Sequence, residues 1–261
     1  MFCHNERIFN KMKLNIKNKT VVIIGASKGI GLYISKSFLN EGAIVHCVSR
    51  FGNKLVEKQL KSKFKKKVFF YNCDATVEKQ VLDCSNKIGK LNNVDILVCN
   101  VGSGRFPNES INSSKLWSES WAINFDSALN SVRAFKKYIS NGSILFISSI
   151  AGNEFINAPT DYSVAKSSLI SLTKILSHKL APEIRVNSIS PGNIFIKDGT
   201  WDIISRENPK KVKKILKEKV PLKRFGKPEE VADLATFISS DRASFITGSC
   251  YIIDGGQTLS F

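Results

Sequence analysis

The chain has 261 residues, 43% of them hydrophobic, which suits one α/β domain that buries a substantial core. Its formal net charge of +17 comes from 39 Lys and Arg against 22 Asp and Glu. No apolar run reaches the length of a membrane span and the N-terminus lacks the apolar middle of a signal peptide, so composition favours a cytoplasmic protein with no membrane partner.

The N-terminal residues 1–18 are polar and rich in Lys, and we expect them to be a disordered extension before a single domain at 19–261. Met12 is an alternative start. It would leave residues 1–11 outside the native protein.

The positive charge is concentrated in two Lys-rich runs, at residues 61–67 and 210–219. A nucleic-acid-binding surface is one interpretation. Neither run is interleaved with stacking aromatic residues, and both fall on expected surface helices, so solvated helix faces are the better interpretation. We therefore expect no nucleic-acid partner, although the positive electrostatic field of the protein should attract anionic ligands.

The six cysteines include no Cys-x-x-Cys pair. Four of them lie in or beside expected strands, and we expect these to be reduced and buried: Cys47, Cys73, Cys99 and Cys250. A zinc site would need clustered Cys and His, but the three histidines are scattered along the chain. The sequence therefore predicts no metal site.

Short apolar runs alternate with amphipathic stretches from end to end, which is typical of βαβ units. Expected strands occupy residues 20–24, 44–49, 68–72, 95–99, 143–148, 185–190 and 251–253. Expected helices occupy residues 30–40, 54–64, 77–88, 115–139, 162–180 and 228–239. The strands are nearly continuous in Val, Ile and Phe, so both faces of the sheet should be covered. With right-handed crossovers this predicts a doubly wound Rossmann-type α/β domain with a seven-stranded parallel sheet.

Residues 195–226 break this rhythm, because they hold no expected strand but include a Lys-rich helical stretch at 209–219. The segment directly follows the carboxyl end of the sixth strand. Ligands bind at that edge of open α/β sheets, so we expect residues 195–226 to form a substrate lid.

A glycine-rich turn, Gly25-Ala-Ser-Lys-Gly29-Ile-Gly31, follows the first expected strand and leads into a helix. Glycines there let a pyrophosphate approach the N–H groups of the helix N-terminus, whose dipole favours negative charge. The strand before and the helix after make the motif informative. It predicts dinucleotide contacts from Gly25, Ser27, Lys28, Gly29, Ile30 and Gly31.

Tyr162 and Lys166 are four residues apart on an expected helix, and Ser149 lies thirteen residues before Tyr162 at the end of an apolar strand. An ammonium on the same helix face favours the ionised phenol, whose free pKa of about 10 is too high for easy proton exchange at neutral pH. Alone, the pair is better explained as part of a surface helix whose side chains only cover apolar area. Beside a nucleotide-binding turn it indicates a proton-transfer site.

The Gly-x-x-x-Gly-x-Gly spacing, together with Ser149, Tyr162 and Lys166, resembles the short-chain dehydrogenase/reductase family from about residue 19 to about residue 258. Other ordered landmarks are Asn100-Val-Gly102, Asn124, Pro191-Gly192, the Phe225-Gly-Lys-Pro228 stretch and Asp254-Gly-Gly256. The resemblance implies an NAD(P)-dependent oxidoreductase that interconverts a carbonyl and a secondary alcohol by hydride transfer.

The resemblance also implies the catalytic roles. Tyr162 exchanges the proton, Lys166 lowers the Tyr162 pKa and holds the nicotinamide ribose, and Ser149 hydrogen-bonds the developing oxyanion. Ser148 is the neighbouring candidate, but the thirteen-residue spacing favours Ser149. Asn124 resembles the residue that holds a water linking Lys166 to solvent; otherwise an Asn in a helix indicates a local hydrogen bond or a kink.

The second expected strand ends in Ser49-Arg50. A carboxylate side chain at position 49 would bind the ribose hydroxyls of NAD and repel a 2′-phosphate. The chain has a hydroxyl there instead, followed by the Arg50 guanidinium and with Lys28 on the same side, which favours NADP(H) over NAD(H). The alternative is that Arg50 only caps a strand in solvent. Asp74 resembles the family's adenine-contacting Asp or is an N-cap for the helix near residue 77.

The remaining cofactor contacts that the resemblance implies are Asn100, Gly102, Pro191, Gly192 and Ile194. The family commonly has a Thr shortly after the Pro-Gly pair. This chain reads Asn-Ile-Phe-Ile-Lys there, which puts the cofactor contacts of that loop in doubt.

Two substrate classes compete. The overall pattern resembles 3-oxoacyl carrier protein reductases, and the basic surface suits an acidic carrier, although residues 181–184 lack the basic residue expected at such a docking face. The stretch 193–201 instead resembles keto-sugar reductases of cell-surface carbohydrate synthesis, in which Trp201 could stack on a sugar or, as we favour, pack the lid.

A non-catalytic dinucleotide-binding scaffold is the alternative of another class, and the intact Ser149, Tyr162, Lys166 and Asn124 set argues against it. The resemblance further implies a homodimer or homotetramer formed through the helices before the fifth and sixth strands.

Overall fold

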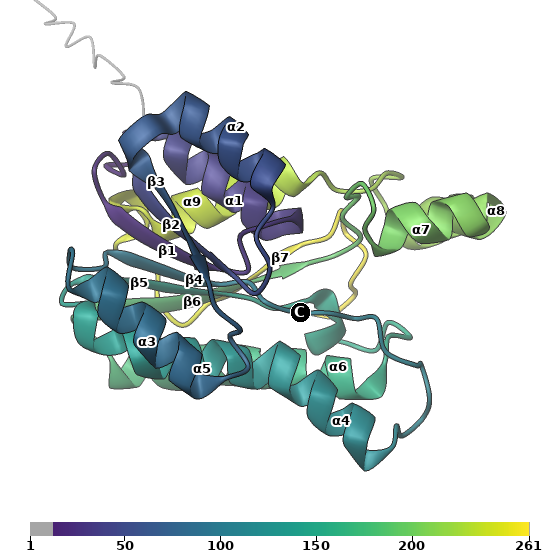
Figure 1. The fold of residues 1–261 in the computed structure, drawn as a ribbon. Coiled ribbons are helices and arrows are strands. Elements are labelled where there is room, and N and C mark those ends of the chain that lie inside the picture. The colour runs from purple at the N-terminus through teal and green to yellow at the C-terminus, as the bar shows by residue number, and fades with distance from the viewer. Residues whose placement is uncertain (1–12, 261) are drawn as a thin grey trace, which may run out of the picture.

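The computed structural model describes residues 13–260 of the chain. Seven parallel strands form one sheet in the order β3-β2-β1-β4-β5-β6-β7 (Figure 1). The strands are β1 (Thr20–Ile24), β2 (Ile44–Ser49), β3 (Val68–Asn72), β4 (Ile96–Cys99), β5 (Gly142–Ile147), β6 (Ile184–Pro191) and β7 (Cys250–Ile253). The predicted fold class, a doubly wound α/β sheet, is confirmed.

Helices cover both faces of this sheet. They are α1 (Gly29–Asn40), α2 (Lys54–Phe64), α3 (Glu78–Gly89), α4 (Ser114–Trp121), α5 (Ser127–Phe135), α6 (Thr160–Lys179), α7 (Thr200–Glu207), α8 (Pro209–Lys219) and α9 (Pro228–Ser239). In Figure 1, α1, α2 and α9 lie on one face and α3, α5 and α6 on the other. Each face therefore has its own apolar core, one centred on residues such as Phe38 and the other on residues such as Phe135.

The position of the ligand site follows from the strand order. Strand β1 pairs with β2 on one side and with β4 on the other, so the chain reverses its direction of travel across the sheet between β1 and β4. Ligands of open α/β sheets bind in the crevice beyond the carboxyl ends of the strands at such a point. Gly25, Ser49, Asp74, Asn100, Ser149 and Pro191 all lie at or just after a strand's carboxyl end.

The predicted helix at 115–139 is not one regular helix. It begins as α4, passes through a π-helical turn at Ala122–Asp126, continues as α5 and ends in a 3-10 turn at Lys136–Tyr138. A π turn inserts an extra residue into the helical ladder, and such turns are frequent at functional sites. Asn124 lies in the middle of it.

The N-terminal boundary that we predicted is too late. Residues 1–12 lie outside the described part of the chain, but Ile16 is 1% exposed within the core and Asn18 donates its backbone N–H to Gly42. Burial of an apolar side chain holds this segment against the sheet, so residues 13–18 are not a disordered extension.

The cysteines depart from prediction in one place. Cys47, Cys73 and Cys99 are buried free thiols as expected, and Cys84 on α3 is buried too. Cys250 is only partly buried, because it begins the edge strand β7, which has a neighbouring strand on one side alone.

Residues 195–226, the lid predicted from the sequence, contain two helices instead of one. Helix α8 was expected, whereas α7 was not. An isolated parallel bridge between Ile194 and Gly226 joins the two ends of the segment. Figure 1 shows α7 and α8 projecting away from the sheet, beyond the carboxyl ends of the strands.

Candidate active site

The glycine-rich turn after β1 is closely packed. Gly25 and Gly29 have φ of +91° and +59°, a region that favours glycine. A Cβ on Gly31 would lie 2.1 Å from the Gly25 carbonyl oxygen, so no side chain fits there. Asn100 Nδ2 donates to the same oxygen at 2.9 Å and ties the end of β4 to this turn.

The turn fits a dinucleotide pyrophosphate. Helix α1 begins at Gly29, and its N-cap residue Lys28 provides no side-chain hydrogen bond to the first turn. The backbone N–H groups of that turn are therefore free to bind a phosphate, which the helix dipole favours. Lys28 is exposed beside them.

Arg50 and Asp74 meet at the ends of β2 and β3. Arg50 Nη1 lies 3.6 Å from Asp74 Oδ2, and its guanidinium lies over the ring of Phe51. Arg50 is therefore not simply a strand cap in solvent. Ser49 donates its hydroxyl to the Phe51 carbonyl oxygen at 3.1 Å.

Asp74 does not cap α3, since the N-cap position is Val77. Instead, Asp74 Oδ1 accepts hydrogen bonds from the backbone N–H and the hydroxyl of Thr76, at 3.0 and 2.8 Å. Partial burial by itself would raise the pKa of Asp74, but these hydrogen bonds and the Arg50 charge lower it below its ordinary value. The carboxylate is thus fixed in its ionised form beside Arg50.

Ser149 and Ser148 have different surroundings. Ser149 follows β5, and its Oγ accepts the backbone N–H of Ala151 at 3.2 Å, which leaves the hydroxyl proton available. Ser148 is buried and donates its hydroxyl to the carbonyl oxygen of Lys166 at 2.7 Å. The structure therefore assigns Ser148 to a structural hydrogen bond.

Tyr162, in the first turn of α6, is partly buried. Burial raises the pKa of its phenol, and a hydrogen bond with Ser149 opposes that rise. Lys166, one turn further on, has its Nζ 5.9 Å from the Tyr162 ring centroid.

The expectation that Lys166 lowers the Tyr162 pKa stays a prediction, because Lys166 makes its hydrogen bond to a backbone oxygen in this structure. Lys166 is 3% exposed, and its Nζ donates to the Ile147 carbonyl oxygen at 2.9 Å instead of to the phenol. Burial lowers the pKa of Lys166 to about 8, so part of its positive charge is lost near neutral pH.

Asn124 is fully buried and bonded on both sides of its amide. Its Oδ1 accepts the backbone N–H of Ser103 at 2.8 Å, and its Nδ2 donates to the carbonyl oxygens of Ser103 and Ser120, both at 3.0 Å. The π turn therefore serves to hold the segment that follows β4. A Cβ on Gly102 would lie 2.8 Å from Lys166 Nζ and 3.1 Å from Asn124 Oδ1, so this glycine permits the close approach of both groups.

Residues 101–113, which we call the substrate loop, connect β4 to α4 without any helix or strand. A Cβ on Gly104 would be 3.7 Å from the Tyr162 ring, so the loop passes beside the phenol. Arg105 then reaches the predicted lid, where its Nη2 donates to the Asp198 carbonyl oxygen at 3.1 Å and its Nε to Thr200 Oγ1 at 3.5 Å.

The loop after β6 contributes Pro191, Gly192 and Ile194. A Cβ on Gly192 would lie 2.6 Å from Asp254 Cβ, which explains the pairing of the two Gly-containing landmarks. Ile196 stands where the family commonly has Thr, and its Cδ1 would be 3.8 Å from a Cβ on Gly29. An apolar side chain thus packs toward the glycine turn at that position.

Within residues 13–260, no helix is both long and apolar enough to cross a membrane. The same residues contain no group of three or more His, Cys, Asp or Glu side chains arranged to hold a metal ion.

Comparison with known proteins agrees with this geometry. The family model described as enoyl-(acyl carrier protein) reductase matches residues 25–258. The chain belongs to the short-chain dehydrogenase/reductase family. It is therefore an oxidoreductase, and the family that the sequence motifs predicted is confirmed.

Its relatives within the short-chain family act on different compounds. An isoepoxydon dehydrogenase of Penicillium expansum is 31% identical over 92% of this chain and 95% of its own length. A 3-oxoacyl-[acyl-carrier-protein] reductase of Rickettsia felis is 32% identical over 94% and 99%. The crystal structure of L-sorbose reductase from Gluconobacter frateurii, complexed with NADPH and L-sorbose, has a TM-score of 0.89 and 30% identity and covers 96% of this chain and 100% of that one.

In this short-chain oxidoreductase, the structure brings the sequence-predicted catalytic residues to one edge of the sheet, together with the glycine turn. Sequence reasoning missed Ser103, Arg105 and the structural role of Ser148. Arg105 lies three residues after the Asn100-Val-Gly102 motif, and its position in a long loop that leaves a strand's carboxyl end could have indicated it.

Proposed function

We propose that this protein is an NADPH-dependent reductase that interconverts a carbonyl and a secondary alcohol. The observation that carries the proposal is the meeting of Ser149, Tyr162 and Lys166 beside Gly102 and the glycine turn. When bound there, NADPH supplies the hydride. Tyr162 gives its phenolic proton to the carbonyl oxygen, and the Ser149 hydroxyl donates a hydrogen bond to the same oxygen as negative charge develops on it.

Lys166 and Asn124 have supporting roles. Lys166 Nζ lies near Gly102, from where it can hold the nicotinamide ribose and add positive charge near the phenol. Asn124 holds Ser103, and with it the start of the substrate loop, through two hydrogen bonds. In this proposal Asn124 also holds a water molecule that relays a proton from solvent to Lys166. Contacts along the rest of the cofactor come from Ser27, Ile30, Asn100, Pro191, Gly192 and Ile194.

The test is NADPH oxidation with a panel of small ketones, 3-oxoacyl thioesters and keto sugars, in wild type and Tyr162→Phe. We expect turnover by wild type and its loss in the variant, with NADPH binding by fluorescence preserved in both. Binding of NADPH with no turnover of any compound by wild type would favour the non-catalytic scaffold.

NADPH is preferred to NADH in this proposal because Arg50 and Lys28 offer positive charge where a 2′-phosphate would lie, and Ser49 offers no carboxylate to repel it. In this proposal, Asp74 holds the Arg50 guanidinium in place and contacts the adenine of the cofactor. A cytoplasmic location agrees with free thiols at Cys47, Cys73, Cys84, Cys99 and Cys250.

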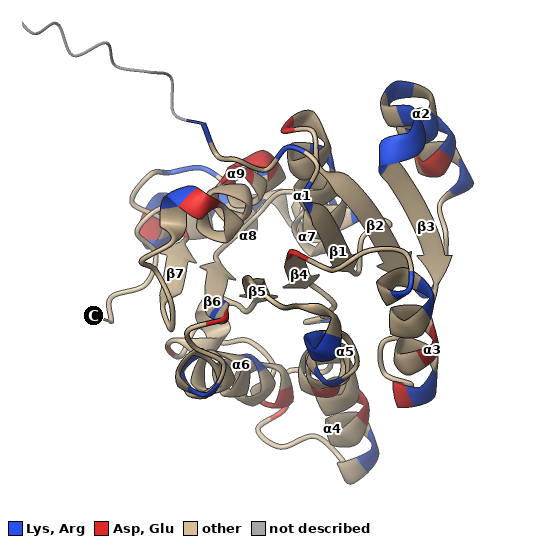
Figure 2. Cartoon of the chain, turned by 90° about the vertical axis from the view of Figure 1, so that its left-hand side faces the viewer, with Lys and Arg blue, Asp and Glu red and all other residues tan. Residues whose placement is uncertain are grey.

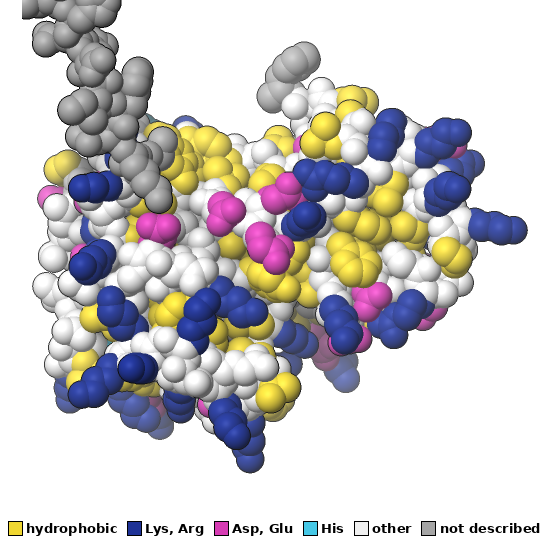
Figure 3. Space-filling model, turned by 90° about the horizontal axis from the view of Figure 1, so that it is seen from above, with side chains coloured by type: hydrophobic (Ala, Val, Ile, Leu, Met, Phe, Trp, Pro, Cys, Tyr) yellow, Lys and Arg dark blue, Asp and Glu magenta, His cyan; other side chains and the backbone are white. Residues whose placement is uncertain are grey.

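The substrate that we favour is a 3-oxoacyl thioester linked to an acidic carrier. Helix α8 carries six lysines and one glutamate, and Lys210, Lys213, Lys214 and Lys217 share one face. Within the described residues none of the four makes a salt bridge, and their side chains donate no hydrogen bond. Figure 3 shows basic side chains around the projecting lobe that holds α7 and α8.

Helix α2 is also basic, as Figure 2 shows, but it offers a poorer docking face. Lys67 Nζ donates to the Gly42 carbonyl oxygen at 2.7 Å, and Lys63 Nζ to Asn40 Oδ1 at 3.5 Å. These lysines are held by their neighbours. In contrast, α8 packs on α7, whose first residue Thr200 is contacted by Arg105 beside the active site. Its free basic face suits an acidic partner delivering substrate to that site.

Two substrates separate the docking role from the chemistry: the 3-oxobutanoyl group on an acyl carrier protein, and the same group on N-acetylcysteamine. Changing Lys210, Lys213, Lys214 and Lys217 to Glu should lower kcat/KM for the carrier-linked substrate by about 10- to 100-fold and leave the small thioester unaffected. The matched control changes Lys58, Lys61, Lys63 and Lys66. Equal losses in both variants would contradict docking on α8.

A keto sugar is the second candidate, favoured by the likeness to the L-sorbose reductase structure. Trp201 packs against Phe225 with ring centroids 5.4 Å apart, and Phe225 against Phe195 at 5.6 Å. The Trp201 ring thus helps to pack the lid, as we favoured, and this leaves less of it for stacking on a sugar. The substrate panel decides between the two.

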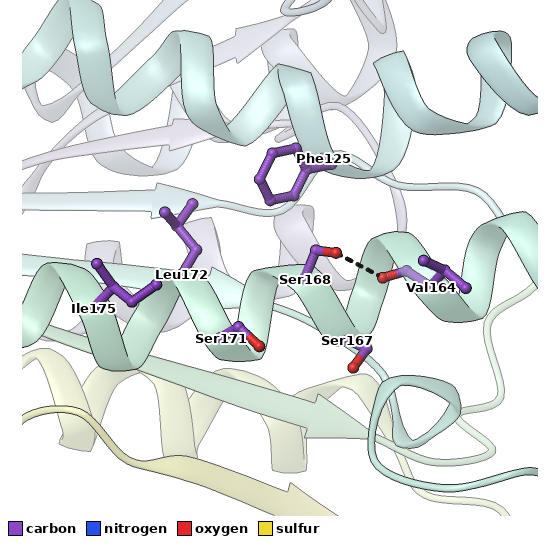
Figure 4. A pocket seen from close by; sticks show the side chains of 7 residues that line it. All are labelled: Phe125, Val164, Ser167, Ser168, Ser171, Leu172 and Ile175. Atoms are coloured by element: carbon purple, nitrogen blue, oxygen red, sulfur yellow. Dashed lines mark hydrogen bonds between the residues drawn. The ribbon is translucent and has the colours of Figure 1, made fainter.

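We further propose that the protein is a homodimer or homotetramer. A groove of about 330 Å³ runs along the outer face of α6, as Figure 4 shows, and is lined by Phe125, Val164, Ser167, Ser168, Ser171, Leu172 and Ile175. None of the proposed catalytic residues is among those that line it. Val164 and Ile175 are 42% and 52% exposed, and the small serines would let another helix approach closely. Light scattering of wild type and Ile175→Glu tests this, with dissociation expected in the variant.

A further inference from the structure

A buried carboxylate next to the catalytic tyrosine is not used by the proposed chemistry. Asp161 is 1% exposed, and its Oδ1 accepts a hydrogen bond from Asn112 Nδ2 at 3.1 Å. Asn112 is 6% exposed and also donates to the Pro107 carbonyl oxygen at 3.0 Å. A single amide therefore closes the end of the substrate loop on itself and fastens it to helix α6.

This contact has an uncommon cost. Asp161 Oδ2 and Asn112 Oδ1 are both buried and have no hydrogen-bond partner within the described residues. A polar group in such a position costs free energy unless it is paired. Asp161 lies in the first turn of α6, whose N–H groups and dipole favour a negative charge. The helix dipole thus favours the carboxylate, and the Asn112 amide is the hydrogen-bond donor that the described residues provide for it.

The other hydrogen bonds that join the substrate loop to Asn157, before α6, and to Thr160, its first residue, are exposed. Asn108 Nδ2 donates to the carbonyl oxygen and to Oδ1 of Asn157, both at 3.2 Å, and Thr160 Oγ1 donates to the Glu109 carbonyl oxygen at 3.2 Å. Exposed hydrogen bonds exchange readily with water and contribute little to position. Asn112 to Asp161 is the buried attachment among them.

The loop has two fixed ends. At its start, the backbone N–H of Ser103 is hydrogen-bonded to Asn124, and at its end the Asn112 amide is hydrogen-bonded to Asp161. Between them Gly104 passes beside the Tyr162 ring and Arg105 contacts the lid. Because Asp161 directly precedes Tyr162 on the same helical turn, the distance between the loop and the phenol depends on this attachment.

We infer that Asp161 is a positioning residue that, through Asn112, holds the substrate loop against the catalytic tyrosine. The inference rests on the proposed reductase function, since it assigns the loop as the wall against which the carbonyl substrate is placed. Because Asp161 is buried and contacts the loop through Asn112, it should act on substrate binding and leave the cofactor site unchanged.

The experiment compares wild type with Asp161→Ala and Asn112→Leu by steady-state kinetics, NADPH titration and hydrogen exchange of peptides covering residues 101–113. We expect KM for the carbonyl substrate to rise by about tenfold or more while kcat changes by less than about threefold, because the loop sets binding more than chemistry. The NADPH Kd should be unchanged. Exchange at 101–113 should accelerate in both variants.

Two further variants separate this role from a merely structural one. Asp161→Asn keeps an acceptor for the Asn112 amide, so its KM and exchange should stay near wild type. Thr160→Val removes an exposed attachment of the same loop and should also behave as wild type. A KM in Asp161→Ala equal to that of wild type, or equal effects in Thr160→Val and Asp161→Ala, would overturn the inference.

Failure of the proposed function has a different signature. If wild type reduces no carbonyl compound, the reductase proposal fails, but hydrogen exchange without substrate still tests the attachment. Unchanged exchange at 101–113 in both Asp161→Ala and Asn112→Leu would overturn it. If Asp161→Ala does not fold, Asn112→Leu and Asp161→Asn give the comparison.

Discussion

Ser148 Oγ donates to the carbonyl oxygen of Lys166 at 2.7 Å, so the first of two adjacent serines fastens α6 to the end of β5, and the second, Ser149, is the proposed oxyanion donor. We expect Ser149→Ala to lower kcat by about 10²- to 10³-fold without changing the melting temperature, since it removes an oxyanion donor. Ser148→Ala should instead lower the melting temperature and leave kcat nearly unchanged.

The stability loss in Ser148→Ala should be about 1 to 3 kcal/mol, because a buried carbonyl oxygen loses its donor. Thermal melts and steady-state kinetics of the two variants check both statements. Similar kcat losses in both, with unchanged stability, would contradict the division of roles.

Lys166 gives a prediction about pH. Burial lowers its pKa from 10.5 to about 8, so between these values the unfolded chain binds more protons than the folded one. Stability should therefore rise with pH across that window, and the burial of Lys166 costs stability below about pH 8.

Replacing Lys166 by Met should abolish catalysis and flatten this pH dependence. It should also raise stability at pH 7 by up to about 3 kcal/mol, the cost of a shift of this size. Urea melts from pH 7 to pH 10 measure the effect. A variant that is less stable than wild type at pH 7 would show that the Lys166 hydrogen bond to Ile147 outweighs the desolvation cost.

Gly102 and Gly104 form a matched pair. A Cβ on Gly102 would lie 2.8 Å from Lys166 Nζ, whereas a Cβ on Gly104 would be 3.7 Å from the Tyr162 ring, an ordinary contact. Gly102→Ala should therefore displace Lys166 and lower kcat/KM by about 100-fold, because small misplacements of catalytic groups have large effects. Gly104→Ala should keep most activity, as steady-state kinetics can show.

Arg50→Ala should weaken NADPH binding by about 10- to 100-fold and NADH binding far less, because the guanidinium would lose a charge-assisted contact with the 2′-phosphate alone. Titration followed by nucleotide fluorescence measures both dissociation constants. Lys58→Ala, which removes an exposed charge on α2, is the control and should leave both nearly unchanged. Equal losses for the two nucleotides in Arg50→Ala would contradict the cofactor preference.

The sequence was sufficient to predict the strands and the sheet, because apolar runs such as those of β1 and β4 are long enough to be recognised and every crossover carries a helix. A kink at Asn124 was only one alternative, and the sequence could not predict its form as a π turn. The π turn there is set by tertiary hydrogen bonds to Ser103, which leave no mark in the helical pattern of residues 115–139. Helix α7 was missed because it has only eight residues, fewer than the window over which helical periodicity is recognised.

The site shows the same division. Spacing favoured Ser149 over Ser148, and the hydrogen bond of Ser148 gives the physical reason. Spacing also predicted that Lys166 would lower the pKa of the Tyr162 phenol. In the structure, Lys166 Nζ donates its hydrogen bond to the carbonyl oxygen of Ile147. Competition from a backbone acceptor on another strand is invisible in a linear motif. The links of Asp161 and Arg105 to distant segments were unpredictable for the same reason.

The shorter hydrogen bond from Arg105 to the predicted lid is to the main-chain oxygen of Asp198. A backbone acceptor is present whatever amino acid stands at that position. Mutation could therefore change the side chains of α7 and α8, and that of residue 198 itself, while the hydrogen bond from Arg105 to the main chain there survives. The arrangement separates the part of the molecule that can diversify from the part that must stay constant.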